Sequence, residues 1–501
     1  MKTRKSYTFY FWIVSLILAL AKLVFTLRPE IDLFTEEAQY WLWSQNMAWH
    51  FYSKPPMVAL LNYLSTGLLG NTEIGVRINA IVFGIGISWI TFLLARRMYS
   101  ERVGFWAAMI LQSMPMWWLV STFHMTDTAL TFFWILMIYA IYRGLEEDNV
   151  SWWVIAGLAT ALGLISKLIM ILAFPFLIFY MFYLGSWQKY RYHFLVFMLL
   201  SSLGFIPMLI WNWQNDFFTF KHLAALGGAS GESSPIDFSK SSGQLLEYLG
   251  GQVVMISLFL LPLFGGFILR LKFYRDQKSV FLLSAPALSW ISFAFLSFFT
   301  KIEVNWPIFA YSGLAISLAA WLVNGNVRTR LYRNWAVGLS IGIPMLFILP
   351  DFTFLKGISS IKKAEKSIFR RNSGYFPLAN RVQFLQDSLG AKDAFVFSET
   401  YHMASELAFY LRNNPQTFML NMGSRTNQFD LWPGLEQFEG IEKKGLFVSW
   451  NYDSPGDFVE FDQLIYEEKF PVEFRGLLSR VATIQVWQNL QKYQPFTPES
   501  F

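Results

Sequence analysis

The chain contains no cysteine, which excludes disulfides, thiolate zinc sites and a cysteine nucleophile. It is also poor in charge, because charged residues make up 15% of its 501 residues, where a soluble domain carries about a quarter. The sequence has no Gly-rich phosphate loop, metalloprotease motif or nucleophile elbow. Hydrophobic residues reach 54% and lie in long runs. Together these features predict a polytopic α-helical membrane protein.

The predicted membrane spans come from apolar runs that are long enough, or nearly so, to cross a bilayer. We predict about eleven of them. They lie at 7–27, 74–94, 104–122, 128–142, 152–165, 168–184, 194–213, 250–269, 280–299, 305–323 and 335–350. The first run is longer than a signal-peptide core and no small-residue cleavage site follows it, so we expect a retained helix.

Basic linkers predict the orientation of these spans. The lysines and arginines concerned are Lys2, Arg4, Lys5, Arg96, Arg97, Arg102, Lys189, Arg191, Arg270, Lys272, Arg275, Lys278, Arg328, Arg330 and Arg333. With eleven spans all of them fall on one side, which the positive-inside rule makes cytoplasmic. The net charge of +6 therefore indicates orientation rather than nucleic-acid binding. One linker, RGLEEDN, is mostly acidic and departs from the pattern.

The composition changes after residue 350, so we predict two domains. Residues 1–350 form a transmembrane domain whose first outer loop is 28–73, while 351–501 carry ordinary charge and no spanning run. In the second part, β-like runs such as DAFVFSE and GLFVSWN accompany one helical stretch, YHMASELAFYLRN. This pattern predicts a small C-terminal α/β domain. The orientation places it on the outer face, with the N-terminus in the cytoplasm.

The first outer loop contains the stretch EEAQYWLWSQNMAWHFYSKPP. Thr35 is a candidate N-cap, which would put Glu36 and Glu37 in the first turn of a helix. Acids there complement the helix dipole, an ordinary structural role worth about 0.3–1 kcal/mol. The tryptophans of the stretch have an ordinary interpretation too, because tryptophan is enriched at membrane interfaces.

Three lysines fall on the same predicted face. Lys54 precedes two prolines, so its backbone is held extended, and a lysine fixed near the headgroups can bind a phosphate as a point charge. Lys167 in GLISKLIM and Lys301 in FFTKIEVNWP are similar candidates. All three have the alternative of simply snorkelling to the membrane surface.

Asp127, in STFHMTDTALTFF, begins an apolar helix on that face, either as a first-turn acid or as a functional group. His124 lies three residues earlier, a spacing that permits shared metal ligation and leaves a divalent metal ion open. Several lysines beside carboxylates would suit a phosphate-bearing anionic lipid and a group that loses a proton.

These motifs resemble bacterial glycosyltransferase family 39, a family of C-type membrane glycosyltransferases related to protein O-mannosyltransferases and to lipid A aminoarabinose transferases. The first-loop stretch is similar to the family's Asp-Glu-Ala start, Tyr-Trp-x-Trp-Ser run and Tyr-x-x-Pro-Pro ending. Further similar segments, in chain order, are HMTDTALTFFWILM, GLATALGLISKL, KIEVNWPIFAY and VFSETYHMASELAFYL.

The resemblance implies a C-type fold and transfer of a hexosyl or pentosyl group from a polyprenyl-phosphate donor to lipid A, a glycan or a protein, with inversion, at the outer face of the plasma (inner) membrane. Glu36 stands where the family has its catalytic aspartate, and Glu37 and Asp127 match further family acids. Substrate-binding roles are predicted for Tyr40, Lys54, Lys167, Lys301 and His124. Ser53 replaces an acid of the aminoarabinose transferases, which removes a ligand from any metal site of that kind.

The sequence leaves other functions open. A lipid or sugar transporter or flippase would explain the spans and buried charges, although transporters usually show paired repeats, and this chain shows none. A lipid-linked glycan polymerase or ligase would use a similar substrate. In a non-catalytic alternative, the C-terminal domain is a binding module and the membrane part is its scaffold.

Overall fold

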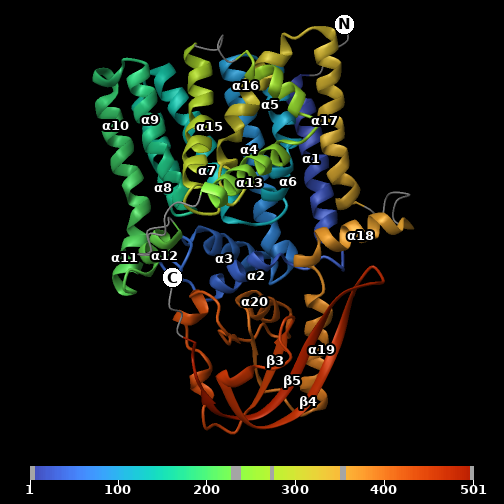
Figure 1. Ribbon diagram of the computed structural model, residues 1–501. Helices are drawn as coiled ribbons and strands as arrows, with labels where there is room; N and C mark the ends of the chain where they lie inside the picture. Colours follow the sequence, from blue (N-terminus) through green and yellow to red (C-terminus); the bar gives the residue numbers. More distant parts are fainter. Residues whose placement is uncertain (1–5, 227–237, 271–275, 350–356, 497–501) are drawn as a thin grey trace. The chain divides into compact units, whose positions relative to one another are not determined.

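The chain is described by a computed structural model that covers residues 6–226, 238–270, 276–349 and 357–496 (Figure 1). Five of the basic residues used to predict orientation, Lys2, Arg4, Lys5, Lys272 and Arg275, lie outside these ranges. The chain divides into two compact units. The membrane unit comprises Met1–Leu23, Lys54–Val58 and Arg77–Ile348, and the loop-and-sheet unit comprises Val24–Ser53, Ala59–Val76 and Leu349–Phe501. Most of the first loop therefore belongs to the same compact unit as the C-terminal segment.

Within the described ranges, six helical segments are long and apolar enough to cross a membrane. They are α1 (Tyr7–Thr26), α4 (Glu73–Met98), α7 (Thr126–Glu147), the run Trp187–Gln214 formed by α10 (Trp187–Ser202), η2 (Leu203–Phe205) and α11 (Ile206–Gln214), α15 (Gln277–Leu296) and α17 (Val327–Ile348). A seventh is obtained if α13 (Phe238–Ile256) and α14 (Leu261–Ile268), which meet at a bend of 112°, count as one span. The chain is thus a multi-pass membrane protein, as predicted.

The predicted number of eleven spans is not confirmed by length and composition. Several predicted spans correspond to shorter helices, namely α8 (Val150–Leu164), η1 with α9 (Leu168–Leu172 and Ala173–Tyr183), and η4 with α16 (Ile308–Ala310 and Tyr311–Val323). The predicted span 104–122 is divided into α5 (Glu101–Gln112) and α6 (Pro115–Val120). The division falls at Met114, because the following proline disfavours helical backbone there and starts the next helix. The membrane unit also contains α12 (Phe218–Leu226), and α3 (Met57–Leu69) lies mostly in the loop-and-sheet unit.

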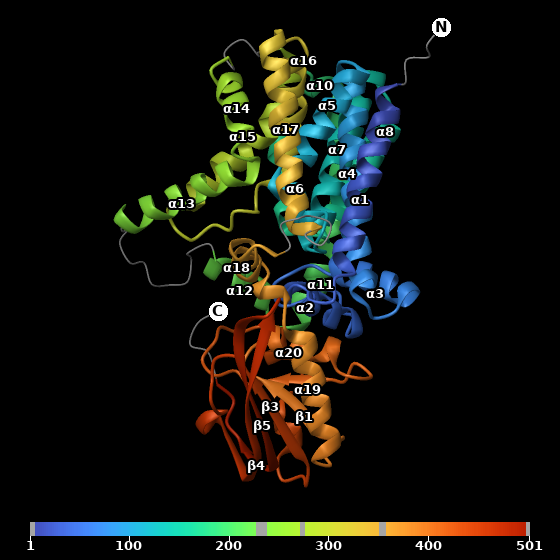
Figure 2. The same ribbon diagram turned by 90° about the vertical axis from the view of Figure 1, so that its right-hand side faces the viewer.

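Close helix packing in the membrane unit depends on small residues. The helix α8 contacts both α7 and α10, and α5 contacts α16 (Figures 1 and 2). At Gly157 of α8 an added Cβ would lie 2.8 Å from the Leu200 Cβ and 3.0 Å from the Phe197 carbonyl oxygen of α10. Only glycine permits this approach, as is common between membrane helices.

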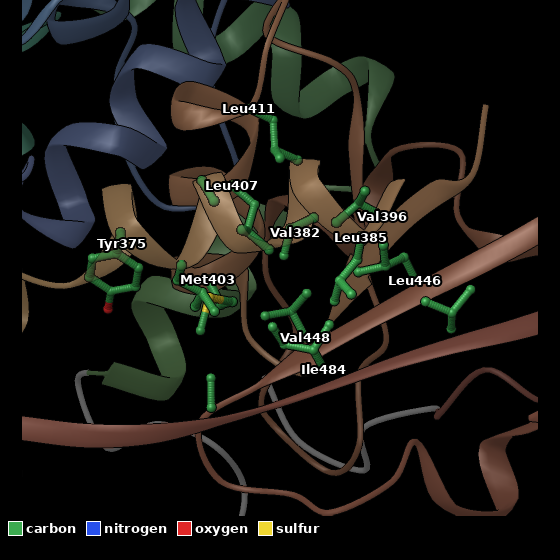
Figure 3. Packing of buried hydrophobic residues seen from close by; sticks show 14 of the residues in the cluster. Tyr375, Val382, Leu385, Val396, Met403, Leu407, Leu411, Leu446, Val448 and Ile484 are labelled. Atoms are coloured by element: carbon green, nitrogen blue, oxygen red, sulfur yellow. The ribbon is translucent and has the colours of Figure 1, made fainter. Parts of the chain in front are cut away.

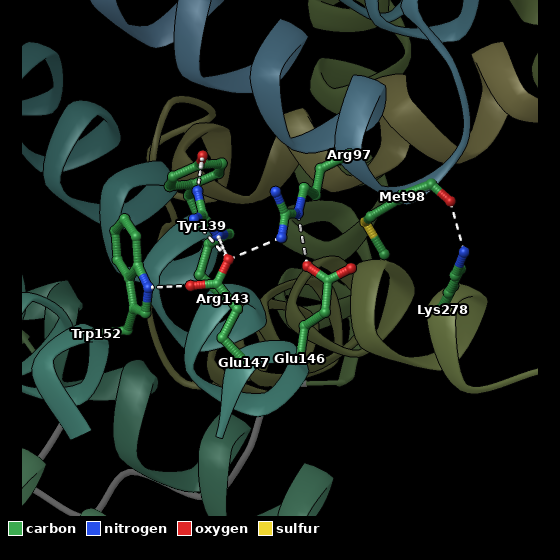
Figure 4. Close-up of polar contacts among 8 residues, drawn as sticks. All are labelled: Arg97, Met98, Tyr139, Arg143, Glu146, Glu147, Trp152 and Lys278. Atoms are coloured by element: carbon green, nitrogen blue, oxygen red, sulfur yellow. Dashed lines mark hydrogen bonds and ion pairs between the residues drawn. The ribbon is translucent and has the colours of Figure 1, made fainter. Parts of the chain in front are cut away.

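The acidic linker that departs from the basic pattern is neutralised locally (Figure 4). Arg97 at the end of α4 donates to both Glu146 and Glu147, at 2.7 Å each. Arg143 and the Trp152 indole also donate to Glu147, each at 2.8 Å. Because each carboxylate is paired with arginine, the acids at this end of α7 add little net negative charge. The linker therefore conflicts less with the positive-inside pattern than its acidic sequence indicates.

The loop-and-sheet unit is a small α/β domain together with first-loop helix α2 (Thr35–Gln45), as far as its described residues show. Its C-terminal elements are α18 (Ser359–Ile368), η7 (Arg370–Asn372), α19 (Tyr375–Ser388), β1 (Phe395–Ser398), α20 (Tyr401–Tyr410), β2 (Thr417–Met419), η8 (Gln428–Leu431), η9 (Leu435–Phe438), β3 (Lys444–Ser449), η10 (Gly456–Phe458), β4 (Val459–Phe474) and β5 (Leu477–Tyr493). The strand order is β2-β1-β3-β5-β4, with β1 parallel to β2 and β3 and the other pairs antiparallel.

Side-chain alternation gives this sheet two apolar faces. On one face Val396, Leu446 and Ile484 pack under Val382 of α19 and Leu407 of α20 (Figure 3). On the other face the intervening phenylalanines of β1 and β3 pack against η9. Burial on both faces explains why the short central strands read as continuous apolar runs in the sequence.

A cluster of buried charges joins the β4–β5 hairpin to the start of the first loop. The turn residues Arg475 and Gly476 both have positive φ, as a two-residue hairpin turn requires. Arg475 donates to Glu30 at 2.8 Å and pairs with Glu365 of α18 at 3.3 Å, and Arg28 donates to Glu30 at 3.1 Å. Burial raises the pKa of Glu30, but backbone hydrogen bonding and the Arg28 charge outweigh it, so the pKa lies below 4.5. This carboxylate therefore stabilises the unit above pH 4.5, and the contribution is lost as pH falls through the lowered pKa.

We predict that Glu365→Gln lowers the free energy of unfolding by about 3 kcal/mol, because it removes a carboxylate with no exposed surface that faces two arginines. The control is Asp387→Asn, which removes an exposed acid paired with Lys392 and Arg412 and should cost well under about 1 kcal/mol. Thermal unfolding of the purified proteins in detergent measures both. Equal losses in the two variants would contradict a stabilising role for the buried cluster.

Candidate active site

The carboxylates of the first loop occupy the start of α2 in two different ways. The prediction that Thr35 is the N-cap is wrong, because the helix begins at Thr35 and its N-cap is Phe34. The Glu37 side chain reaches back and accepts a hydrogen bond from the Phe34 backbone N–H at 2.9 Å, which fixes Phe34 in that position. Glu37 is fully buried, so in this unit it acts as a helix-start residue.

The helix α2 is buried along nearly its whole length. Of its eleven residues, only Glu36 and Gln45 are not buried. Trp41 packs edge-on against Phe409, and Trp43 stacks on Phe51 with ring centroids 4.5 Å apart. Tyr40, a predicted substrate-binding residue, is buried beside Trp43, with ring centroids 5.2 Å apart. These aromatic residues of α2 are therefore packing residues, which the structure favours over a membrane-interface role.

The partner of α2 is α20, the helix of the VFSETYHMASELAFYL segment. Trp41, Leu42 and Ala404 lie in one buried apolar cluster, with Ala408 and Phe409 of α20 in the same cluster. Polar contacts flank it. The Leu33 N–H donates to the Tyr410 hydroxyl at 2.7 Å, and the Tyr52 N–H donates to the Gln428 side-chain oxygen at 2.7 Å. Two of the motifs that carried the family resemblance thus meet in space.

Glu36 presents its carboxylate at the first turn of α2 with both oxygens engaged. One oxygen accepts a hydrogen bond from the Arg371 guanidinium of η7 at 2.8 Å, and the other accepts from the Thr35 hydroxyl at 2.8 Å. The Glu36 side chain keeps 27% of its surface exposed. Because a carboxylate offers about four acceptor sites, it can still accept a hydrogen bond from a bound hydroxyl group.

Two aromatic residues of α20 lie within electrostatic reach of Glu36. Burial raises the pKa of Tyr401, and the Glu36 charge adds to this shift. Burial lowers the pKa of His402 to about 4, although the Glu36 carboxylate opposes the shift. The His402 ring lies 4.0 Å from the Tyr401 ring. His402 is therefore neutral at physiological pH, so Glu36 has a neutral imidazole and a protonated phenol within its electrostatic reach.

In the membrane unit, Asp127 and Lys167 form a buried ion pair. The Lys167 ammonium donates to one Asp127 oxygen at 2.8 Å, and the Asn305 side-chain amide donates to the other at 2.9 Å. Asp127 and Lys167 are 3% and 6% exposed, so Lys167 does not snorkel to a surface. The structure brings together three motifs that lie far apart in the sequence, each of which contributes one polar side chain.

The Lys54 segment is anchored near this pair. The backbone N–H of Met57, just after the two prolines, donates to the Ile165 carbonyl oxygen at 3.0 Å. Ile165 caps the C-terminus of α8, two residues before Lys167. This bond fixes the Lys54-Pro55-Pro56 turn against the segment that carries the buried lysine.

The other predicted residues of the membrane unit are placed differently. Lys301 pairs with Glu247 at 2.7 Å, and both side chains are more than half exposed. His124 is fully buried in the connection between α6 and α7. Among the residues that the structure describes, no three or more His, Asp or Glu side chains are grouped to hold a metal ion. The shared ligation suggested by the spacing of His124 and Asp127 therefore gains no third protein ligand there.

The structure adds residues that the sequence did not single out. Asn305 lies within KIEVNWPIFAY, and Tyr401 and His402 lie within VFSETYHMASELAFYL, so the motifs contained a signal for them. Arg371 had none, because it stands outside every recognised segment and reaches Glu36 only through the tertiary fold.

We predict that Asp127→Asn destabilises the protein by about 3 kcal/mol, because it leaves the buried Lys167 ammonium without its carboxylate. The double variant Asp127→Asn with Lys167→Met should recover part of this loss, since no buried charge then remains. Lys301→Met, which breaks an exposed pair, is the control and should cost less than about 1 kcal/mol. Thermal unfolding in detergent reports all three. A double variant less stable than Asp127→Asn would contradict the buried pair.

A family model described as dolichyl-phosphate-mannose-protein mannosyltransferase matches residues 53–211. A curated relative, the lipid A galacturonosyltransferase RgtD of Rhizobium johnstonii, is 25% identical over 316 residues, which span 62% of this chain and 63% of that protein. The match thus spans less than two thirds of the relative's length.

Solved structures extend the similarity of the fold over nearly the whole chain. The crystal structures of ArnT from Cupriavidus metallidurans, in the apo state and bound to undecaprenyl phosphate, align with TM-scores of 0.62. Both are 15% identical and cover 94% of this chain, and 97% and 98% of the respective ArnT chains. The resemblance predicted from the first-loop motif is confirmed as a similarity: part of the chain is similar to the mannosyltransferase family model and to a lipid A galacturonosyltransferase, and its fold is similar to that of ArnT.

Proposed function

We propose that this protein is an integral-membrane glycosyltransferase that moves a sugar from a polyprenyl-phosphate donor to a lipid, glycan or protein acceptor at the outer face of the inner membrane. The observation that carries the proposal is the Glu36 carboxylate. It is the one acidic side chain of α2 that is not buried, and the first-loop resemblance matches it to the family's catalytic aspartate. The curated relative and the fold shared with ArnT support the same activity.

The reaction is a single displacement at the anomeric carbon. The acceptor hydroxyl oxygen forms the new bond to that carbon as the bond to the phosphate oxygen breaks, and the configuration inverts. The hydroxyl proton passes to Glu36, and the polyprenyl phosphate leaves with the bonding electron pair. Burial raises the pKa of Tyr401, so the phenol keeps its proton, and Glu36 is the carboxylate of this group.

Lysines bind the departing phosphate in this mechanism. Lys54 precedes two prolines in a turn that is anchored to the segment before Lys167, and both residues supply positive charge. Negative charge grows on the phosphate as the bond breaks, so fixed ammonium groups stabilise the transition state more than the bound donor. Asp127 and Asn305 hold Lys167 in place, and Asp127 thereby assists the reaction through orientation. Lys301 is exposed and contributes only to the electrostatic potential around the site.

The relatives guide the choice of substrates for the first assay. RgtD is a lipid A galacturonosyltransferase and the ArnT structure holds undecaprenyl phosphate. The donor probe is therefore galacturonic acid linked to undecaprenyl phosphate, and the acceptor probe is lipid A. Mass spectrometry of lipid A and surface glycans from cells with and without the gene then identifies the natural sugar and acceptor. A flippase or polymerase would leave lipid A unmodified in the purified system.

We predict that Glu36→Gln lowers turnover at least about 100-fold, the scale of a lost general base, while thermal stability hardly changes. Lys54→Ala should instead raise the KM for the lipid donor. The measurement is transfer of galacturonic acid to lipid A by the purified enzyme in detergent. Glu36→Asp restores the residue of the family and shortens the reach, so it should be slower than wild type but faster than Glu36→Gln.

The acidic neighbours provide the control for this assignment. If Glu36→Gln retained near-normal transfer while Glu37→Gln or Asp32→Asn abolished it, Glu36 would not be the catalytic acid. If neither these acids nor Asp127 affected transfer, the glycosyltransferase proposal itself would be wrong.

We predict that the C-terminal domain lies outside the cytoplasm, joined to an eleventh span, because the basic linkers alternate around an odd number of spans. A C-terminal alkaline phosphatase fusion should be active and a C-terminal green fluorescent protein fusion should be dark. The reverse result would refute both the number of spans and the outer-face placement of the site.

A further inference from the structure

We propose that Arg371, a residue of the C-terminal segment, is a positioning residue for the Glu36 carboxylate, so that the acid is set for reaction only when the C-terminal domain is docked on α2. The inference rests on the proposed function, because it concerns how that acid is oriented. It assigns the C-terminal domain a part in catalysis beyond acting as an appended module.

The contacts around Glu36 form a closed triangle. The same Arg371 nitrogen donates to a Glu36 oxygen at 2.8 Å and to the Thr35 hydroxyl at 3.3 Å, and that hydroxyl donates to the second Glu36 oxygen at 2.8 Å. The guanidinium also lies over the Phe34 ring, 4.7 Å from its centroid. Arg371 therefore contacts three successive residues at the start of α2. This arrangement fixes the side-chain torsions of the acid more tightly than a single ion pair would.

The backbone that carries Arg371 is clamped to the first loop from both sides. The Asp32 N–H donates to the Asn372 carbonyl oxygen at 2.8 Å, and the Asp32 carboxylate accepts from the Tyr375 N–H at 2.6 Å. Gly374, with φ of +92°, makes the turn between these bonds, and an added Cβ would collide with Val472. Arg480 donates to the Ser373 carbonyl oxygen at 2.7 Å. Arg371 thus projects from a rigid turn rather than from a loose loop.

An arginine in this position orients the carboxylate. It holds one oxygen, which leaves the other acceptor sites aimed in a defined direction, and misplacement by about 1 Å can cost about 100-fold in rate. Tyr401 and His402 of α20 and Arg425 also act electrostatically near Glu36. Of the charged side chains in the described part of the chain, Arg371 is the one recorded in an ion pair with Glu36.

The competing interpretation is an ordinary surface ion pair. Arg371 is 55% exposed and Glu36 is 27% exposed, and pairs of this kind contribute little to stability. The two interpretations differ in what a substitution changes. A structural pair affects thermal unfolding slightly and leaves kinetics alone, whereas a positioning residue changes turnover without changing donor affinity.

The test is steady-state kinetics of full-length Arg371→Gln in detergent, with undecaprenyl phosphate-linked galacturonic acid and lipid A as probes. We expect turnover to fall about tenfold to 100-fold while the donor KM stays within about twofold. Arg371→Lys retains the charge but not the paired donor geometry, so its turnover should lie between those of the wild type and Arg371→Gln.

The matched control is Arg370→Gln, which removes a neighbouring exposed arginine for which the structure records no contact with Glu36. It should keep the wild-type turnover and donor KM, and all three variants should unfold near the wild-type temperature. Equal losses for Arg370→Gln and Arg371→Gln would overturn the inference, as would a change in Arg371→Gln that is confined to the donor KM. If Glu36→Gln is inactive and Arg371→Gln is fully active, the positioning role fails and the proposed function stands. If Glu36→Gln is fully active, the proposed function fails first.

Discussion

The hydrogen bonds between Asp32 and the turn at 372–376 are the interaction on which the loop-and-sheet unit depends. They join the first loop to a segment more than three hundred residues later, and they do so through backbone groups at the start of α19. Because Asp32 is buried and its carboxylate accepts two backbone N–H bonds, a shift of either segment would leave buried polar groups without partners. The docking of α2 on α20 and the cluster around Arg475 both extend this junction.

This junction explains why the composition-based division of the chain describes the folded protein only in part. Hydropathy separates apolar runs from ordinary sequence, so it predicts a membrane part and a C-terminal α/β part, and the sheet is present as expected. It carries no information about which polar loop packs on which domain. The first-loop helix lies in one compact unit with the C-terminal segment because Trp41 and Leu42 bury apolar surface against α20. That contact depends on how the surfaces of α2 and α20 fit together, which a hydropathy pattern does not describe.

The sequence also could not distinguish buried from exposed lysines. From sequence, each of Lys54, Lys167 and Lys301 could bind phosphate or snorkel, and Lys54 had the further argument of its pre-proline backbone. In the structure Lys167 is buried on Asp127, whereas Lys301 is exposed on Glu247. An ammonium inside a membrane protein is costly unless it is paired and hydrogen-bonded, and Lys167 meets this condition through Asp127. The motifs contain both lysines, but only burial distinguishes Lys167 from Lys301.

The glutamate at position 36 and the contact that it receives from Arg371 are connected. The family pattern has aspartate where this chain has Glu36, and the longer side chain moves the carboxylate outward by about one carbon–carbon bond, roughly 1.5 Å. An added methylene brings an additional torsion, and that freedom lowers the population of any one reactive orientation. In this chain the Thr35 hydroxyl and the Arg371 guanidinium each hold one oxygen and so remove that freedom. A glutamate at this position can therefore hold its carboxylate in one orientation, because Arg371 of the C-terminal segment supplies the second contact. The longer side chain and the arginine that restrains it depend on each other.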